Sequence, residues 1–293
     1  MRLATLKTAK GEIAGVVTPK GVALIETINA ELGKTYPTEM LSLIESGQLP
    51  AMTKWYNEGG KEKIEALGGK LVPLAEAKYG PLYRNPQKIF GIGLNYVDHA
   101  KDLAEVAPNT EPASFFKPAT TIIGPGDDIK IPLQSEKTTA ESELGVILGK
   151  YCKDIEPENW LDYVAGYTTV IDMTTEDILR KNPRYLTRSK SFDTFFSFGP
   201  VLVTPDEVPD VNALHVATMY NGAVHAENVV SNMTFRPDFL VAFHSKVMPW
   251  LPGDILSTGT PRAVAINQGD VVACRIDGFE TLENPVIDLK LQK

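Results

Sequence analysis

Residues 141–150 read ESELGVILGK and residues 163–173 read YVAGYTTVIDM, and these two segments decide the predicted fold. Each is an apolar run rich in β-branched residues, which favours a strand over a helix. Successive side chains of a strand point to opposite faces, so Glu141 and Glu143 share one face, and Asp172 ends the second run. Three carboxylates on largely apolar strands repel one another and lose solvation unless a cation balances them.

These three acidic residues therefore form a candidate metal site. Oxygen ligands alone favour a hard divalent ion, which we expect to be Mg²⁺ or Mn²⁺, with Ca²⁺ as a further candidate. The alternative is that Glu141 and Glu143 form the solvated face of an edge strand, as most Glu-x-Glu pairs do. The spacing alone leaves both interpretations open.

The rest of the chain predicts a β-rich α+β fold with two domains. Residues 2–8, 11–18 and 21–26 indicate an antiparallel meander, and helices are expected over about 37–46 and 52–69. From residue 88 onward, strand-like runs alternate with loops. A hairpin is predicted at Asn221-Gly222 and a helix within 236–251. We expect a small α+β accessory domain over residues 1–80 and the main domain over 81–293.

Composition excludes several classes of protein. The formal charge of −8 argues against nucleic acid and anionic membranes as partners. No apolar run approaches the roughly 20 residues that span a bilayer, and the start of the chain lacks a signal-peptide core, so a cytoplasmic location is expected. The two cysteines, Cys152 and Cys274, are too few for a disulfide framework and are expected to be buried.

Two further segments offer candidate catalytic residues. In GLNYVDHAKD, residues 93–102, His99 and Asp102 share one face if the segment is helical, so the carboxylate would orient the imidazole to activate water. The alternative is an unremarkable pair on the surface. In KSFDTF, Lys190 would stabilise negative charge that develops on a substrate, or would pair with a core carboxylate such as Asp193.

The segment LPGDILSTGTP supplies a tight turn at Gly259-Thr260-Pro261. Its backbone amide and the Thr260 hydroxyl could bind a carboxylate, although the turn alone is not diagnostic. Gly91-Ile92-Gly93 does not predict a nucleotide site, because no helix with a third glycine follows.

Taken in order, the motifs resemble the fumarylacetoacetate hydrolase family over about residues 86–293. The resemblance is to bacterial acylpyruvases and 2-hydroxyhepta-2,4-diene-1,7-dioate isomerases. It rests on GLNYVDHAKD, FFKP at 115–118, ESELGVILGK, GYTTVIDMTTED at 166–177, KSFDTF, LPGDILSTGTP and GFETLENPV at 278–286.

The resemblance implies a mixed β-sandwich roll and assigns roles to single residues. It makes Glu141, Glu143 and Asp172 the metal ligands, and His99 with Asp102 the catalytic dyad. It places Lys190 in the site, and a homodimer is also implied. The residues expected to bind substrate are Tyr96, Arg184, Arg188, Gly259 and Thr260.

Three positions depart from the family pattern. The dyad acid is usually Glu, and here it is the shorter Asp102. Glu176 stands four residues after Asp172, where the family often has arginine, so Arg184 or Arg188 is expected to bind the substrate carboxylate. The residues after the turn read Arg262-Ala263-Val264, where the family usually has a glycine in the middle. Arg262 is expected to face either the substrate or the solvent.

The leading hypothesis is hydrolysis of a carbon–carbon bond in a small 2,4-dioxo acid, such as an acylpyruvate, in aromatic compound catabolism. His99 would deprotonate a water that attacks the distal carbonyl, and Lys190 would help to stabilise the pyruvate enolate that leaves. The alternatives are decarboxylation of oxaloacetate or tautomerisation of a 2-oxo acid at the same site. A further alternative is a catalytically impaired relative that acts as a binding protein.

Overall fold

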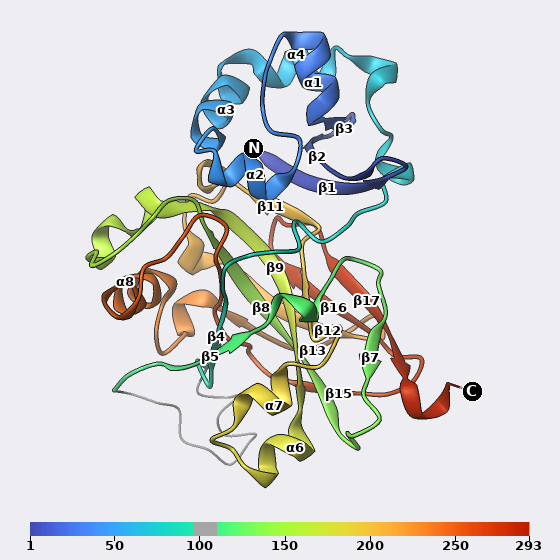
Figure 1. Ribbon diagram of the computed structural model, residues 1–293, viewed down its shortest axis with the longest axis vertical. Helices are drawn as coiled ribbons and strands as arrows, with labels where there is room; N and C mark the ends of the chain where they lie inside the picture. Colours follow the sequence, from blue (N-terminus) through green and yellow to red (C-terminus); the bar gives the residue numbers. More distant parts are fainter. Residues whose placement is uncertain (97–109, 293) are drawn as a thin grey trace.

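The computed structural model describes residues 1–96 and 110–292, and two packed β-sheets form its body (Figure 1). In this part of the chain the larger sheet follows the order β3-β2-β1-β11-β9-β8-β14-β4-β5, with β10 beside β6 and β9 and with β15 beside β8. Its strands are β1 (Arg2–Thr8), β2 (Gly11–Thr18), β3 (Gly21–Leu24), β4 (Ile89–Gly93), β5 (Ala113–Lys117), β6 (Ile122–Ile123), β8 (Thr138–Leu148), β9 (Val164–Thr175), β10 (Phe196–Phe198), β11 (Val201–Val203), β14 (Ile255–Ser257) and β15 (Val264–Ile266).

The smaller sheet follows the order β13-β12-β16-β17-β7. Its strands are β7 (Ile129–Ile131), β12 (His215–Tyr220), β13 (Ala223–Val229), β16 (Val271–Ile276) and β17 (Leu282–Asp288). The predicted hairpin is confirmed, because β12 and β13 pair around Asn221 and Gly222, whose φ angles are 49° and 82°. The β-rich α+β class is confirmed as well.

Short helices lie around the sheets. They are α1 (Ile25–Leu32), α2 (Met40–Glu45), α3 (Leu49–Trp55), α4 (Lys61–Glu65), α6 (Glu176–Lys181), α7 (Leu186–Lys190) and α8 (Pro237–Val247). The expected helices correspond to α2, to α3 and α4 with a kink at Glu58 and Gly59 between them, and to α8. The sequence patterns did not indicate α1, α6 or α7. No helix among the described residues is both long and apolar enough to cross a bilayer.

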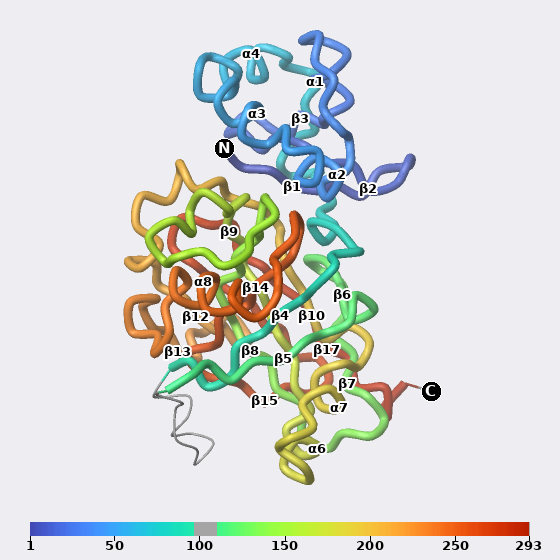
Figure 2. Tube along the Cα trace, turned by 60° about the vertical axis from the view of Figure 1, so that its left-hand side comes forward, coloured from blue at the N-terminus to red at the C-terminus, as the bar shows by residue number. Residues whose placement is uncertain are grey.

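The N-terminal segment is built into the larger sheet. Strand β1 pairs with β2 on one side and with β11 on the other, and β11 pairs with β9. One apolar cluster contains Leu3 and Ile28 together with Ile147 and Phe198. Figures 1 and 2 show the N-terminal helices at one end of the molecule and α6 and α7 at the other. A domain boundary at residue 80 stays a prediction.

Strands β8 and β9 form the centre of the larger sheet. They are antiparallel over nearly their whole length, and all 11 residues of β8 are buried. Strand β8 has β9 on one side and β14 and β15 on the other, so it is not an edge strand. The alternative of a solvated Glu-x-Glu face is therefore wrong.

The smaller sheet covers one face of β8 and β9. Between Glu141 and Glu143, the Ser142 hydroxyl points the opposite way and donates to the Ala273 carbonyl at 3.2 Å. The Cys274 thiol contacts the Glu143 carbonyl oxygen at 3.6 Å, and both cysteines are free and buried, as expected. The two glutamates thus face away from the smaller sheet, which confirms the alternation expected from the sequence.

Asn95 joins two loops at the edge of this face. Its fully buried side chain donates from Nδ2 to the carbonyls of Phe235 at 2.9 Å and Thr258 at 2.7 Å, and Oδ1 accepts from the Phe235 amide. Asn95→Ala strands these three backbone groups in the interior. We expect it to lower the free energy of unfolding by about 3 kcal/mol, measured by urea denaturation.

The matched control is Asn232→Ala, because Asn232 is exposed and, among residues 1–96 and 110–292, its side-chain amide donates to Asn228 alone, at 2.8 Å. This variant should stay within about 0.5 kcal/mol of the unmodified protein. Equal losses in the two variants would contradict the role assigned to Asn95.

Candidate metal centre

Three buried carboxylates converge on one face of the central strand pair. Glu141 lies directly across from Asp172 in the register of β8 and β9, and Glu143 follows two residues later on the same face. One oxygen from each of the three lies within 4.8 Å of the others. Asp172 is 0% exposed and Glu143 is 1% exposed. The structure thus brings together the three residues that the sequence marked as ligands.

The turn after β14 holds Glu143 in place. Oε2 of Glu143 accepts from the Ser257 hydroxyl at 2.6 Å and from the Gly259 amide at 2.7 Å. Gly259 has a φ of +98°, and a Cβ atom there would lie 2.8 Å from Cβ of Asn95. Glycine is therefore required for the turn to approach this closely. The second oxygen of Glu143 remains for a ligand.

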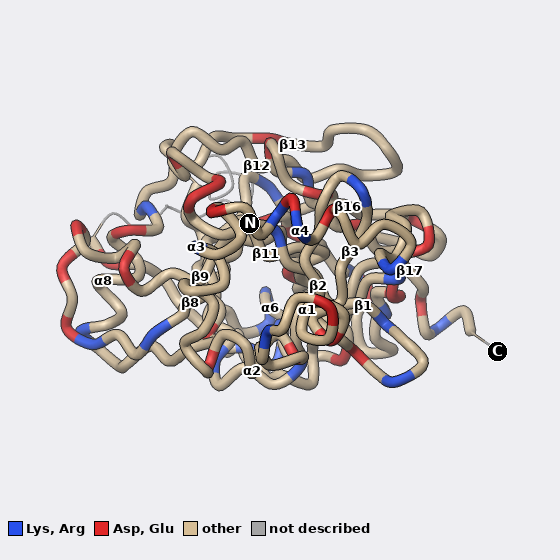
Figure 3. Tube along the Cα trace, turned by 90° about the horizontal axis from the view of Figure 1, so that it is seen from above, with Lys and Arg blue, Asp and Glu red and all other residues tan. Residues whose placement is uncertain are grey.

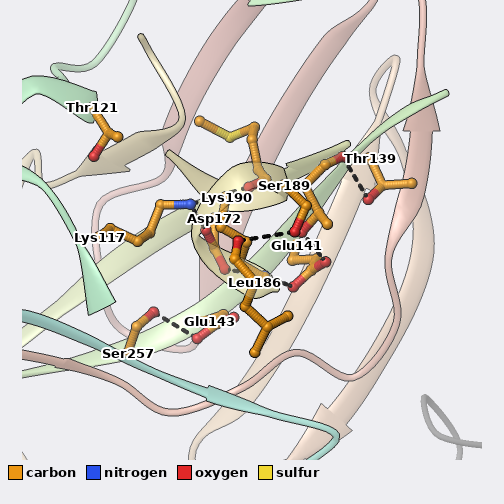
Figure 4. Close-up of polar contacts among 12 residues, drawn as sticks. Lys117, Thr121, Thr139, Glu141, Glu143, Asp172, Leu186, Ser189, Lys190 and Ser257 are labelled. Atoms are coloured by element: carbon orange, nitrogen blue, oxygen red, sulfur yellow. Dashed lines mark hydrogen bonds and ion pairs between the residues drawn. The ribbon is translucent and has the colours of Figure 1, made fainter. Parts of the chain in front are cut away.

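Two lysines neutralise part of this charge, and Figure 4 shows both approaching Asp172. Lys190, at the end of α7, donates to Oδ2 of Asp172 at 2.5 Å and to Oε2 of Glu141 at 3.1 Å. Its Nζ also lies 4.5 Å from the centre of the Phe115 ring. Lys190 thus pairs with core carboxylates, which are Glu141 and Asp172 and not the suggested Asp193. Its role toward a substrate stays a prediction.

Lys117 is the second cation, and its sequence context within the FFKP motif did not predict a role in the site. Its ammonium group donates to Oδ1 of Asp172 and, at 3.1 Å, to the Met173 carbonyl. Lys117 comes from β5, 55 residues before Asp172. The available sequence signal was a lysine that follows two phenylalanines at the end of a strand.

Because these side chains are buried, the pKa of each one depends strongly on the charges beside it. Desolvation, together with the nearby Asp172 and Glu141, raises the pKa of Glu143 to about 8. Desolvation would also raise the pKa of Asp172, but Lys117 and Lys190 outweigh it and lower that pKa. Burial lowers the pKa of Lys117 to about 8, because Asp172 offsets the loss of solvation only in part and the neighbouring Lys190 lowers the pKa further. For Lys190, desolvation is outweighed by the three carboxylates, and its pKa is raised.

The donor set fits a hard divalent cation. When ionised, three carboxylates and two ammonium groups leave one negative charge in a largely buried site, in keeping with the raised pKa of Glu143. Carboxylate oxygens with no sulfur or imidazole favour Mg²⁺ or Mn²⁺. Glu141, Glu143 and Asp172 would hold such an ion and leave further coordination positions for substrate and water.

A cavity of about 390 Å³ opens onto the centre. Its lining includes Glu141, Lys190 and Phe115 from the centre, and Leu179 and Arg180 from α6. The volume lies within the range of sites that take small metabolites, about 300–1,000 Å³. The centre is therefore accessible to a small ligand rather than sealed in the core.

Glu176, the departure from the family pattern, lies at the start of α6 and is fully paired. Its carboxylate accepts from Lys137 at 2.7 Å and from Arg180 at 2.5 Å. Burial raises its pKa, but the hydrogen bonds from these two cations outweigh that effect and lower it. Glu176 thus holds Arg180, which lies one helical turn later on α6, in the lining of the cavity.

The remaining residues expected to bind substrate lie in different surroundings. Tyr96 is fully buried, and its hydroxyl has no hydrogen-bond partner among the described residues. The Gly259 amide is taken by Glu143, and the Thr260 hydroxyl donates to the Arg262 carbonyl at 3.3 Å. Contact of these groups with substrate stays a prediction.

Arg184 and Arg188 are exposed, and neither is among the described residues that line the cavity. His99 and Asp102 lie outside the described residues, so the proposed dyad also stays a prediction. Figure 3 shows acidic and basic residues interspersed along the chain.

Residues 88–287 match the family model described as "Fumarylacetoacetate (FAA) hydrolase C-terminal". Among curated proteins, the chain is 38% identical over 212 residues to oxaloacetate tautomerase fahd2, mitochondrial, of Xenopus laevis, and the match covers 69% of this chain and 66% of that protein, just under two thirds. It is 32% identical over 288 residues to oxaloacetate tautomerase FAHD2A, mitochondrial, of Homo sapiens, covering 94% of this chain and 88% of that protein.

Among solved structures, the chain is similar to maleylpyruvate hydrolase from Sphingobium sp. SYK-6 in complex with manganese (II) ion and pyruvate. The TM-score is 0.78 with 27% identity, and the match covers 98% of this chain and 99% of that one. Both the match to the family model and the similarity of the whole fold agree with the resemblance inferred from the motifs. The chain belongs to the fumarylacetoacetate hydrolase family.

Proposed function

We propose that this protein is a divalent-metal-dependent enzyme that interconverts the keto and enol forms of a small 2-oxo acid of the oxaloacetate type. The observation that carries the proposal is the pair of buried lysines on the metal-binding carboxylates. Lys190 lines the cavity and makes the centre suited to hold negative charge on a substrate oxygen, while Lys117 balances Asp172 and is not part of the cavity lining. That is the demand of enolisation, in which a proton leaves carbon 3 and another joins the oxygen on carbon 2.

The residues would divide the work in the following way. A cation bound by Glu141, Glu143 and Asp172 would supply a Lewis acid for the 2-oxo group. Lys190, which faces the cavity, would bind the same end of the substrate and stabilise the charge that develops there. Phe115 and Leu186 would exclude water from the reacting carbons. The two relatives named as oxaloacetate tautomerases support this reaction over the others.

Hydrolysis of a 2,4-dioxo acid is the second candidate, favoured by the similarity to maleylpyruvate hydrolase. Both reactions pass through an enolate at the same centre, and they differ in whether a water must be activated. His99, oriented by Asp102, is the residue that we propose for that step. A cytoplasmic location and a homodimer stay predictions, as does a purely binding role.

The two reactions can be separated by one set of assays. With Mn²⁺ present, we expect the protein to convert the enol of oxaloacetate to the keto form well above the rate with Mn²⁺ alone, and chelation should abolish this activity. Acetylpyruvate is assayed in parallel for release of acetate. Cleavage of acetylpyruvate without action on the oxaloacetate enol would make hydrolysis the function.

His99→Ala serves as the discriminating variant. It should abolish any cleavage of acetylpyruvate, because that step needs an activated water. Retention of full cleavage by this variant would exclude the proposed dyad. If neither substrate is turned over while Mn²⁺ binds, the binding role is favoured.

A further inference from the structure

The wall of the cavity contributed by α6 contains a cation that is not part of the metal centre. Among the described residues that line the cavity, Lys190 and Arg180 are the cationic ones. Lys190 is already bound to Glu141 and Asp172. Arg180 lies on α6, whereas Lys190 lies on α7, and Arg180 makes no contact with the three carboxylates.

The side chain of Arg180 is held in place by Glu176, but part of its guanidinium group has no hydrogen-bond partner among the described residues. Its Nε and Nη2 atoms both donate to the same oxygen of Glu176, at 2.8 and 2.5 Å. A guanidinium has five N–H donors, and Nη1 makes no hydrogen bond to any described residue. The side chain is 63% exposed, so these donors are accessible from the cavity. An arginine held on one edge is prepared to bind a carboxylate with the other.

The charge around Arg180 favours an anion. Glu176 is 6% exposed and forms ion pairs with both Lys137 and Arg180. One carboxylate and two cations give this group of three a net positive charge. Asp177, the next acidic residue, does not line the cavity. It accepts instead from the Ser135 hydroxyl at 2.8 Å and from the Glu136 amide at 3.2 Å.

We propose that Arg180, held by Glu176, selects substrates that carry a second carboxylate remote from the metal centre. The substrate class is then a 2-oxo dicarboxylic acid, whose 2-oxo end lies at Glu141, Glu143 and Asp172 and whose far carboxylate lies at α6. Arg180 determines specificity and touches no reacting atom. This inference rests on the proposed function, because it assumes that the 2-oxo end binds at the centre.

The test uses two probes of matched length, 2-oxoglutarate and 2-oxopentanoate, which differ by a terminal carboxylate in place of a methyl group. Both are titrated calorimetrically into the Mn²⁺-loaded protein. We expect the unmodified protein to bind 2-oxoglutarate more tightly. Arg180→Met should weaken that binding about ten-fold or more and leave 2-oxopentanoate unchanged, while Arg180→Lys should restore part of the preference.

Lys181→Met is the matched control, since it removes one positive charge from the same helix at an exposed position outside the cavity lining. It should change the affinity for neither probe. Unchanged binding of 2-oxoglutarate by Arg180→Met, with both probes still bound, would overturn this inference and leave the proposed function intact. Failure of the unmodified, Mn²⁺-loaded protein to bind either probe would overturn both.

Discussion

Glu143→Gln is expected to weaken Mn²⁺ binding at least about 100-fold and to abolish turnover of oxaloacetate. Even residues that only orient a metal ligand contribute about 10–100-fold to affinity, and Glu143 is itself a proposed ligand. The amide is nearly isosteric with the carboxylate, and its oxygen can still accept from Ser257 and Gly259. The second oxygen, however, becomes an NH₂ group, which cannot bind a cation.

Affinity is measured by calorimetric titration with Mn²⁺, and folding by the midpoint of urea denaturation without metal. Glu283→Gln is the control, because Glu283 is an exposed residue of β17 and lies far along the chain from the centre. It should bind Mn²⁺ like the unmodified protein. Tight Mn²⁺ binding by a folded Glu143→Gln variant would remove Glu143 from the ligand set.

Lys190→Met is expected to lower kcat about 100-fold while Mn²⁺ binding is retained. The loss follows from removing a donor aimed at developing negative charge, which typically costs about 100–1,000-fold. Metal affinity should not fall, because Lys190 competes with a cation for Glu141 and Asp172. The separation of the two effects distinguishes this variant from Glu143→Gln.

The measurement combines steady-state kinetics at saturating Mn²⁺ with the same metal titration. Without metal, the variant leaves three buried carboxylates with Lys117 as the nearest remaining cation among the described residues, so the metal-free protein should be less stable. Addition of Mn²⁺ should recover that stability. Unchanged kcat in a variant that binds Mn²⁺ would exclude Lys190 from the reaction.

The metal ligands could be predicted because their signal is local. Acidic residues two apart in an apolar run must share a face if the run is a strand, and burial then demands a cation. The strand assignments for β8 and β9 followed from β-branched composition alone. What the sequence could not supply was the register that places Glu141 across from Asp172, because pairing depends on the whole sheet.

The residues that were missed owe their positions to contacts distant in the chain. Lys117 reaches Asp172 from another part of the larger sheet, and no spacing rule connects them. Helix α6 has only six residues, with no side-chain cap at Thr175, so the pattern around Arg180 carried little helical signal. The Gly259 amide was assigned to substrate because the sequence could not show that Glu143 already occupies it.

The pairing of β1 with β11 links the first residues of the chain to the strand that carries Asp172, since β11 also pairs with β9. Without β1, β11 would be an edge strand with unpaired backbone N–H and C=O groups, which can pair with a strand of another molecule. The N-terminal segment therefore covers the edge of β11, and with it this border of the strands that carry the metal centre. A variant that lacks β1 would expose this edge.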